Sequence, residues 1–128
     1  MQREILFRGK RVDNGEWVEG NYIEKIKPTE VNPVFWCCFI QDKAISMYEV
    51  IPESIGQFTG LTDKNGKKIF EGDILKYEDF IFIVGFTQAK FKALLKDAKD
   101  TSQILGVLLW CESDIIGNVT ENPELLNQ

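Results

Sequence analysis

The sequence contains no histidine, and this absence narrows the chemistry open to the chain more than any other feature of its composition. Histidine is the commonest general acid or base near neutral pH and the commonest metal ligand in proteins. A serine or cysteine nucleophile that depends on an imidazole is excluded as well. We therefore expect a protein that is not an enzyme and that needs no cofactor.

Cysteine is scarce, and its three positions make a poor disulfide framework because their number is odd: Cys37, Cys38 and Cys111. Cys37 and Cys38 are neighbours within an apolar stretch. Neighbours on a strand point to opposite faces, so this pair cannot easily share a metal ion. We expect all three to be reduced thiols that pack as small apolar side chains.

Long apolar runs and an excess of positive charge are also missing. No run approaches the roughly 20 residues that a membrane-spanning helix needs, and the first residues lack the apolar stretch of a signal peptide. These features predict a cytoplasmic protein with no membrane partner. The net charge of −5 makes nucleic acid a less favoured partner than protein, since a domain that neutralises phosphates is expected to be basic.

The residues that are abundant favour strands. The chain has 14 isoleucines, eight valines and 15 aromatic residues, but only four alanines. Residues 5–12 and 16–23 are typical of a hairpin, because Asp13-Asn14-Gly15 between them tolerates positive φ. Further short strands are expected over residues 34–42, 47–51, 57–61, 79–86, 104–111 and 115–119. This spacing predicts a mainly β chain of short antiparallel strands in a barrel-like fold.

Short turns complete this organisation. Proline at position 52 and glycine at position 56 predict a single helical turn, and Asn65-Gly66 predicts a second tight turn. Asn122 followed by Pro123 predicts a short helix capped by the asparagine side chain. Residues 87–99 stay ambiguous: their lysine, alanine and leucine content favours a helix, whereas their apolar residues alternate like a strand.

Two carboxylates are the first candidate site. Glu71 and Asp73 lie two residues apart, a spacing that places both on one face of a strand, where they could bind a divalent cation or act as acid and base. With Glu49 they could serve a metal-dependent or carboxylate-dependent hydrolase. The structural interpretation is stronger: Asp73 follows a glycine and would close a tight bend by bonding backbone N–H groups.

Two groups of basic residues are the second candidate, because either could contact phosphates. One group lies near the N-terminus and the other at a hairpin tip: Arg3, Arg8, Lys10 and Arg11, then Lys64, Lys67 and Lys68. Nearby carboxylates reduce the positive charge of both groups. The simpler interpretation is therefore that these lysine and arginine side chains are solvated and bind nothing.

The three tryptophans are the third candidate. Trp36 and Trp110 lie in apolar stretches and are expected in the core. Trp17 is flanked by glutamates on the first hairpin, so it is the tryptophan expected to be partly exposed and to contact a partner.

Three segments carry a resemblance to a known family. Residues 57–75, with the sequence QFTGLTDKNGKKIFEGDIL, resemble the central signature of the YopX family. The opening REILFRG at residues 3–9 and the ending IGNVTENPELL at residues 116–126 resemble the start and the close of that family. The resemblance thus extends over the chain from end to end.

The resemblance implies a small β-rich protein encoded by a bacteriophage or prophage, without an assigned activity and without catalytic residues to transfer. It implies one YopX-type domain over residues 1–128, with a hairpin lobe (1–56) and a small barrel lobe (57–128) similar to an SH3-like barrel.

Three functional hypotheses follow. The leading one is a non-enzymatic module that binds a host or phage protein or forms a homo-oligomer. The alternative is a nucleic-acid-binding small barrel that acts in phage replication or regulation through the basic groups. The third, a hydrolase that uses Glu71 and Asp73, is the least favoured.

Overall fold

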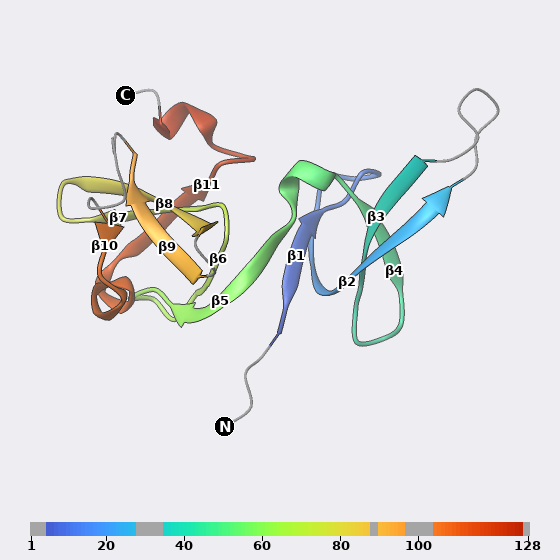
Figure 1. Ribbon diagram of the computed structural model, residues 1–128, viewed down its shortest axis with the longest axis horizontal. Coiled ribbons are helices and arrows are strands. Elements are labelled where there is room, and N and C mark those ends of the chain that lie inside the picture. Colours follow the sequence, from blue (N-terminus) through green and yellow to red (C-terminus); the bar gives the residue numbers. More distant parts are fainter. Residues whose placement is uncertain (1–4, 28–34, 88–89, 97–103, 127–128) are drawn as a thin grey trace. The chain divides into compact units, whose positions relative to one another are not determined.

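The described part of this computed structural model comprises residues 5–27, 35–87, 90–96 and 104–126. It is built from strands and short 3-10 helices, which confirms the prediction of a mainly β chain (Figure 1). Contacts within the chain divide it into two compact units, Met1–Gln57 and Phe58–Gln128. The sequence predicts a border between two lobes at residues 56 and 57.

The first unit holds the strands β1 (Phe7–Lys10), β2 (Trp17–Lys27), β3 (Phe35–Gln41) and β4 (Met47–Val50), the 3-10 helix η1 (Pro52–Ser54) and the start of β5 (Gly56–Thr62). The second unit holds the rest of β5 and the strands β6 (Lys68–Phe70), β7 (Asp73–Tyr77), β8 (Phe80–Thr87), β9 (Lys90–Leu95), β10 (Ile104–Leu105) and β11 (Asp114–Asn118), with η2 (Val107–Glu112) and η3 (Pro123–Leu126). All pairings between these strands are antiparallel, in the hydrogen-bonded orders β4-β3-β2-β1-β5-β6 and β10-β9-β8-β7-β11.

The first hairpin forms where the sequence predicts it. β1 pairs with β2 in a register that sets Phe7 opposite Gly20. Gly15 has a φ of 74°, in the left-handed region that glycine adopts at little cost. The side-chain oxygen of Asn14 accepts a hydrogen bond of 2.9 Å from the N–H of Glu16, which stabilises the turn.

Hydrogen bonds in the first unit join the end of β1 to the end of β4. The N–H of Val12 donates to the carbonyl of Glu49 at 3.0 Å, and the N–H of Ile51 donates to the carbonyl of Lys10 at 2.9 Å. The strands β1 to β4 therefore curl until their first and last members meet. Val50, at this junction, is 1% exposed and belongs to the small core of the unit.

Close packing in the first unit requires glycine at two positions. A Cβ atom on Gly9 would lie 2.9 Å from the side chain of Val50, and one on Gly20 would collide with the carbonyl oxygen of Gln41. Both approaches are possible because glycine has no side chain. The completely buried Ile40 on β3 packs within this curled sheet.

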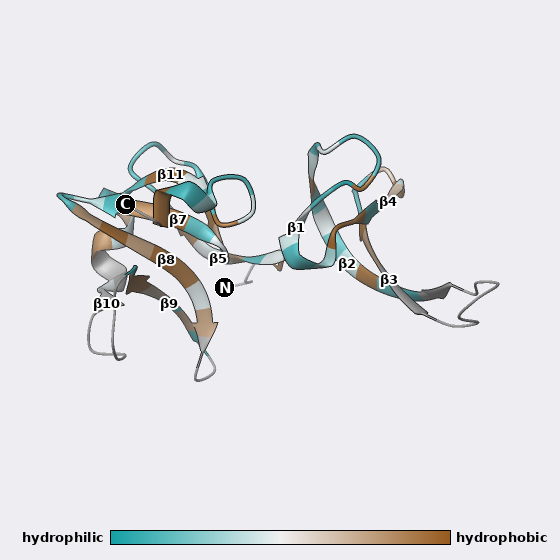
Figure 2. Ribbon diagram, turned by 90° about the horizontal axis from the view of Figure 1, so that it is seen from above, coloured by the Kyte–Doolittle hydropathy of each residue, from teal (hydrophilic) through white to brown (hydrophobic). Residues whose placement is uncertain are grey.

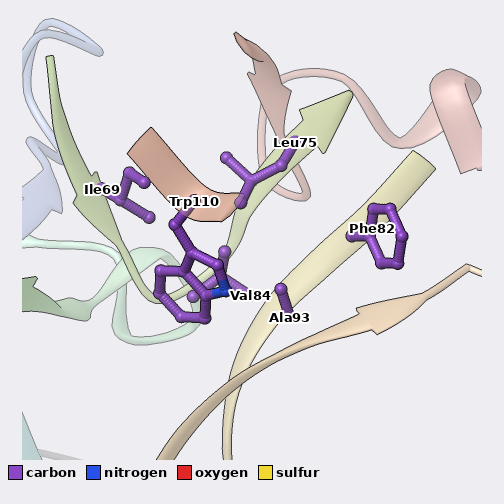
Figure 3. Close-up of a cluster of buried hydrophobic side chains, with 6 residues drawn as sticks. All are labelled: Ile69, Leu75, Phe82, Val84, Ala93 and Trp110. Atoms are coloured by element: carbon purple, nitrogen blue, oxygen red, sulfur yellow. The ribbon is translucent and has the colours of Figure 1, made fainter. Parts of the chain in front are cut away.

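Strand alternation builds the core of the second unit. Leu75 of β7 lies opposite Phe82 of β8, and Val84 of β8 lies opposite Ala93 of β9. Directly opposed residues share one face of a sheet, so this face becomes the buried one. Figure 3 shows the resulting core cluster, which consists of Ile69, Leu75, Phe82, Val84, Ala93 and Trp110.

The predicted turns of the second unit are also present. Gly66 has a φ of 80°, and its N–H donates to the carbonyl of Asp63 at 3.1 Å. Gly72 has a φ of 94° between β6 and β7, where the sequence predicts a bend. Glycine is the residue that both turns require, because other side chains avoid this region.

The ambiguous segment forms a strand where it is described. Lys90–Leu95 is β9, and residues 88–89 and 97–99 lie outside the described residues. Phe91, Ala93 and Leu95 all pack in or against the core cluster. Burial of this alternating apolar set outweighs the modest helix propensity of the lysines and leucines between them.

The prediction of a buried strand over residues 104–111 is wrong for most of its length. Only Ile104–Leu105 pairs, as β10, and Val107–Glu112 forms the 3-10 helix η2. The helix turns Trp110 inward, where it is 1% exposed, as the sequence predicts for this tryptophan. The same turn leaves Cys111 exposed, so the expectation of a packed thiol is wrong there.

The last 3-10 helix, η3, occurs where Pro123 predicts it, but the role of Asn122 differs from the prediction. Its side-chain oxygen accepts a hydrogen bond of 3.2 Å from the N–H of Asn118, and so closes the turn after β11. Its backbone carbonyl accepts the N–H of Leu125 instead. Among the described residues, no helix has the length and apolarity needed to cross a membrane.

Candidate interaction surfaces

The register of β1 and β2 divides the N-terminal basic group between two faces. Arg8 lies opposite Glu19 and Lys10 opposite Trp17, so these four residues share a face. The guanidinium of Arg8 lies 5.0 Å from the centre of the half-buried Trp17 ring. Such a cation–π contact stabilises by about 0.5–1 kcal/mol at an exposed site. Arg3 lies outside the described residues.

Arg11 is on the other face, as strand alternation requires after Lys10. Its guanidinium lies 4.5 Å from the centre of the Tyr48 ring and donates to the carboxylate of Asp13 at 2.9 and 2.6 Å. These side-chain hydrogen bonds hold the pKa of Asp13 below its ordinary value. The positive charge of Arg11 is therefore offset by a carboxylate two residues away.

The second basic group lies at the turn between β5 and β6, in the second unit. Lys64, Lys67 and Lys68 are all exposed, and the ammonium of Lys68 lies 5.7 Å from the centre of the Phe58 ring. The buried Asp63 lies in the same turn. The two predicted basic groups thus belong to different units of the chain.

The predicted carboxylate pair is not arranged as a pair on one strand. Asp73 begins β7 and is 1% exposed, and its Oδ2 accepts the N–H of Phe70 at 2.8 Å. Glu71 lies in the preceding turn, and Glu49 is on β4 of the other unit. Asp73 bonds the backbone of its own bend, as the structural interpretation predicts. Within the described ranges, no group of three or more cysteine or acidic residues could hold a metal ion.

A polar cluster on β2 and β3 was not found by the sequence analysis. The hydroxyl of Tyr22 donates to Oε1 of Glu24 at 2.5 Å and lies 3.4 Å from the sulfur of Cys38. Burial, together with these hydrogen bonds, raises the pKa of Tyr22 well above its ordinary value. The phenol therefore stays a hydrogen-bond donor rather than a base. The sequence offered one indication of this cluster: in a strand, alternation places residues 22 and 24 on the same face.

Exposed aromatic rings at the two ends of β8 were also missed. Phe80 is 53% exposed and Phe86 is 54% exposed, although both share a face with the buried Phe82. The ring of Phe86 meets that of Phe91 on β9 edge to face, with 5.0 Å between the centroids. The sequence of this strand is continuously apolar, so it does not distinguish buried rings from exposed ones. In the structure the core covers the middle of β8 and leaves the rings near its two ends exposed.

Nothing is described for the side chain of Trp36, which the sequence analysis places in the core, or for that of Cys37. Of the two other tryptophans, Trp110 is buried and Trp17 is half-buried.

The described structure is that of a mainly β protein with two antiparallel sheets, whose helices are all short 3-10 turns. The model of the YopX protein family matches residues 6–127. The chain therefore belongs to the YopX family, as the resemblance at its beginning, middle and end indicates.

The structure is similar to the crystal structure of protein EF1440 from Enterococcus faecalis. The TM-score is 0.51 at 24% sequence identity, and the similarity covers 98% of this chain and 99% of that chain. At this identity the similarity shows a shared fold. No curated protein matches the chain.

Proposed function

We propose that this YopX-family chain is a phage-type accessory protein that acts as a non-enzymatic protein-interaction module. Its partner would be a host or phage protein, or a second copy of the chain. The YopX match is the basis for the phage-type part of this proposal. The SH3-like description of the second unit and a cytoplasmic location stay predictions.

The observation that carries the proposal is the aromatic pair on the β8–β9 hairpin. Phe86 keeps 54% of its surface exposed while it contacts Phe91. Aromatic rings are enriched at protein interfaces, where one well-packed ring supplies a large share of the binding energy. Figure 2 shows hydrophobic residues along most of β8, the strand that also contributes Phe82 and Val84 to the core cluster.

The chemistry of the polar groups also favours a binding role. Asp73 is engaged with backbone, and the phenol of Tyr22 has a raised pKa. Since the chain has no histidine, an enzyme would have to rely on such groups.

The test uses tagged full-length protein captured from phage-infected bacterial cells, with and without nuclease, and sedimentation of the purified protein. We expect a stoichiometric protein partner, or self-association, that survives nuclease. Phe86→Ser should weaken it at least about fivefold, the effect of an interface residue worth more than about 1 kcal/mol. Ile45→Ser, at the exposed tip of the β3–β4 turn, is the matched control. A monomer that retains no partner would contradict the proposal.

Nucleic-acid binding is the alternative, and one observation favours it: Arg8, Lys10 and Trp17 share a face of β1 and β2. A cation next to an aromatic ring is a common element of single-strand binding sites. In the capture experiment this alternative predicts material that disappears with nuclease. Its affinity for an oligonucleotide should fall steeply as salt rises.

A further inference from the structure

Asparagine is followed by glycine in two turns of the chain, one in each unit. Asn14-Gly15 lies between β1 and β2, and Asn65-Gly66 lies between β5 and β6. All four residues are exposed. An asparagine side chain before glycine can cyclise, because glycine has no Cβ to keep its backbone nitrogen away from the side-chain carbonyl carbon. Both turns therefore carry the residues that spontaneous deamidation requires.

The reaction needs no group beyond the chain, a base of the solvent and water. The glycine nitrogen gives its proton to the base and attacks Cγ of the asparagine, so that a C–N bond forms and the side-chain nitrogen leaves as ammonia with a proton from the solvent. Water then opens the cyclic imide at either carbonyl, which gives aspartate or isoaspartate. Negative charge develops on Oδ1 during the attack, and an N–H group that donates to this oxygen stabilises it.

The turn between β1 and β2 already has such a donor. Oδ1 of Asn14 accepts the N–H of Glu16 at 2.9 Å. This hydrogen bond folds the side chain of Asn14 back toward its own C-terminal backbone, where the nitrogen of Gly15 lies. It also polarises the carbonyl that is attacked. The native hydrogen bond of this turn is therefore one that favours the reaction.

In the turn between β5 and β6 the corresponding N–H, that of Lys67, has a different acceptor. It donates to Oδ1 of the buried Asp63 at 2.9 Å. The side-chain nitrogen of Asn65 donates to Oδ1 of Asp114 at 3.0 Å. This second bond holds the leaving group in place, and the charge of Asp114 opposes the negative charge that would develop on the amide. The hydrogen bonds of this turn therefore disfavour the reaction.

The attacking nitrogen is held alike in the two turns. The N–H of Gly15 donates to the carbonyl of Arg11, and the N–H of Gly66 donates to the carbonyl of Asp63, both at 3.1 Å. Either bond has to open before the glycine nitrogen can attack. The difference in rate between the two sites must therefore come from the groups that surround the asparagine side chain.

The product carboxylate has different consequences at the two positions. At position 14 a carboxylate can still accept the N–H of Glu16, and the guanidinium of Arg11 lies in the same turn. At position 65 a carboxylate would face that of Asp114, so a hydrogen bond would be replaced by repulsion between like charges. The turn that disfavours the reaction is thus also the turn that its product would damage.

We propose that Asn14 is a site of spontaneous deamidation in the folded protein. Asn65, although glycine follows it as well, is protected by its hydrogen bond to Asp114 and by the engagement of the Lys67 N–H elsewhere. The modification adds one negative charge beside Arg11 without an enzyme, so the charge of the β1–β2 turn changes with the age of the protein. It does not depend on the proposed protein-binding function.

The test incubates the folded full-length protein at mildly alkaline pH and follows both sites by peptide mass spectrometry. We expect Asn14 to convert at least about fivefold faster than Asn65, the effect of one ordinary hydrogen bond. In urea that unfolds the chain, the two rates should agree within about twofold, because glycine follows both residues. A smaller ratio in the folded protein, or an equally large one in urea, would overturn the inference. So would a folded protein in which neither site converts while the unfolded chain reacts.

Asp114→Ala tests the protection, because it removes the acceptor of the Asn65 amide. Conversion of Asn65 should rise at least about threefold, whereas that of Asn14 should stay unchanged. Asp114→Asn keeps an oxygen that can accept this hydrogen bond, so it should retain part of the protection. Asp79→Ala is the matched control, since it removes an exposed carboxylate from another turn of the same unit. Equal rates in Asp114→Ala and Asp79→Ala would contradict the protective role of Asp114.

Two further variants imitate the aspartate product, and each is the control for the other because both replace an amide by a carboxylate before a glycine. Asn65→Asp should lower the urea midpoint of unfolding more than Asn14→Asp does, since it alone sets a carboxylate against Asp114. An equal or larger loss for Asn14→Asp would show that position 14 does not tolerate the modification, and would overturn the inference.

Discussion

Asp63 is the residue on which several hydrogen bonds of the second unit converge. It is 3% exposed, and its Oδ1 accepts the N–H groups of Asn65 at 2.8 Å and Lys67 at 2.9 Å. Its Oδ2 accepts the N–H of Ile115 at 3.1 Å, 52 residues along the chain. Burial by itself would raise the pKa of Asp63, but these backbone hydrogen bonds outweigh it and hold the pKa below its ordinary value.

The sign of the resulting pH dependence follows from the lowered pKa. Deprotonated Asp63 stabilises the folded state at pH values above its ordinary pKa, and this contribution is lost as the pH falls through the lowered value. We expect Asp63→Ala to cost roughly 2–4 kcal/mol near pH 7, because three N–H groups lose a charged acceptor. The measurement is urea unfolding between pH 7 and pH 2, in which the difference between wild type and variant should shrink at the acid end.

Asp79→Asn, at an exposed position in the turn before β8, is the control for this experiment. Its stability should stay within about 0.5 kcal/mol of wild type. A constant difference between Asp63→Ala and wild type over the whole pH range would contradict the charge-based explanation.

Substitutions at two glycines distinguish the cost of an unfavourable backbone conformation from the cost of a steric clash. Gly66→Ala should cost about 1 kcal/mol, because its φ of 80° is unfavourable for a side chain although no atom lies within 4 Å of the added Cβ. Gly20→Ala should cost more than about 3 kcal/mol, because its Cβ would strike the backbone oxygen of Gln41. Urea midpoints measure both, and similar losses for the two variants would contradict the packing of β2 against β3.

At the scale of elements, residues 107–112 form the 3-10 helix η2 where the sequence pattern predicts a strand, and the two conformations differ in which side chains they bury. In the helix Trp110 is buried and its neighbour Cys111 is exposed. Ser113 supports this turn, since its N–H and its hydroxyl both donate to the carbonyl of Trp110, at 3.1 and 2.6 Å. The tryptophan fills the centre of the core cluster drawn in Figure 3.

Trp110→Ala should therefore destabilise the second unit by roughly 3–5 kcal/mol, the cost of removing a large core side chain. Cys111→Ala, one residue away, should change stability by less than about 0.5 kcal/mol. Thermal and urea unfolding compare the two variants. Equal losses would favour the buried strand that the sequence pattern predicted.

At the scale of the whole molecule, the charge distribution disfavours non-specific binding to DNA. The chain carries −5 overall, and its two predicted basic groups lie in separate units. Within the first of these groups Arg11 is paired with Asp13. We expect no retention of random-sequence duplex DNA at about 150 mM salt, measured by fluorescence anisotropy. Salt-dependent binding tighter than the roughly micromolar limit of ordinary non-specific binding would move the nucleic-acid alternative to first place.

Local patterns in the sequence were sufficient for much of the architecture. Turn residues that favour positive φ, such as Gly15 and Gly66, predicted both tight turns, because their conformational preference is a property of the residue itself. Period-two alternation predicted most of the strands for the same kind of local reason. The bend that ends in Asp73 could be predicted because a short carboxylate bonds nearby backbone N–H groups.

The remaining features depended on contacts between residues far apart in sequence. The ambiguity of residues 90–95 could be resolved only when Ala93 met Val84 across two strands, since burial there exceeds local helix propensity. The contact between Arg11 and the Tyr48 ring likewise depended on a long-range pairing, that of Arg11 with Val50 of β4.

The sequence by itself determined the β class, the tight turns and the membership of the YopX family, because all three depend on residue types in a local order. The tertiary structure decided which lysines share a surface. Lys76 and Lys90 are 14 positions apart, and they come to one face only through the register of three strands. The grouping of side chains on one face of a sheet is a property of strand pairing, which no single segment contains.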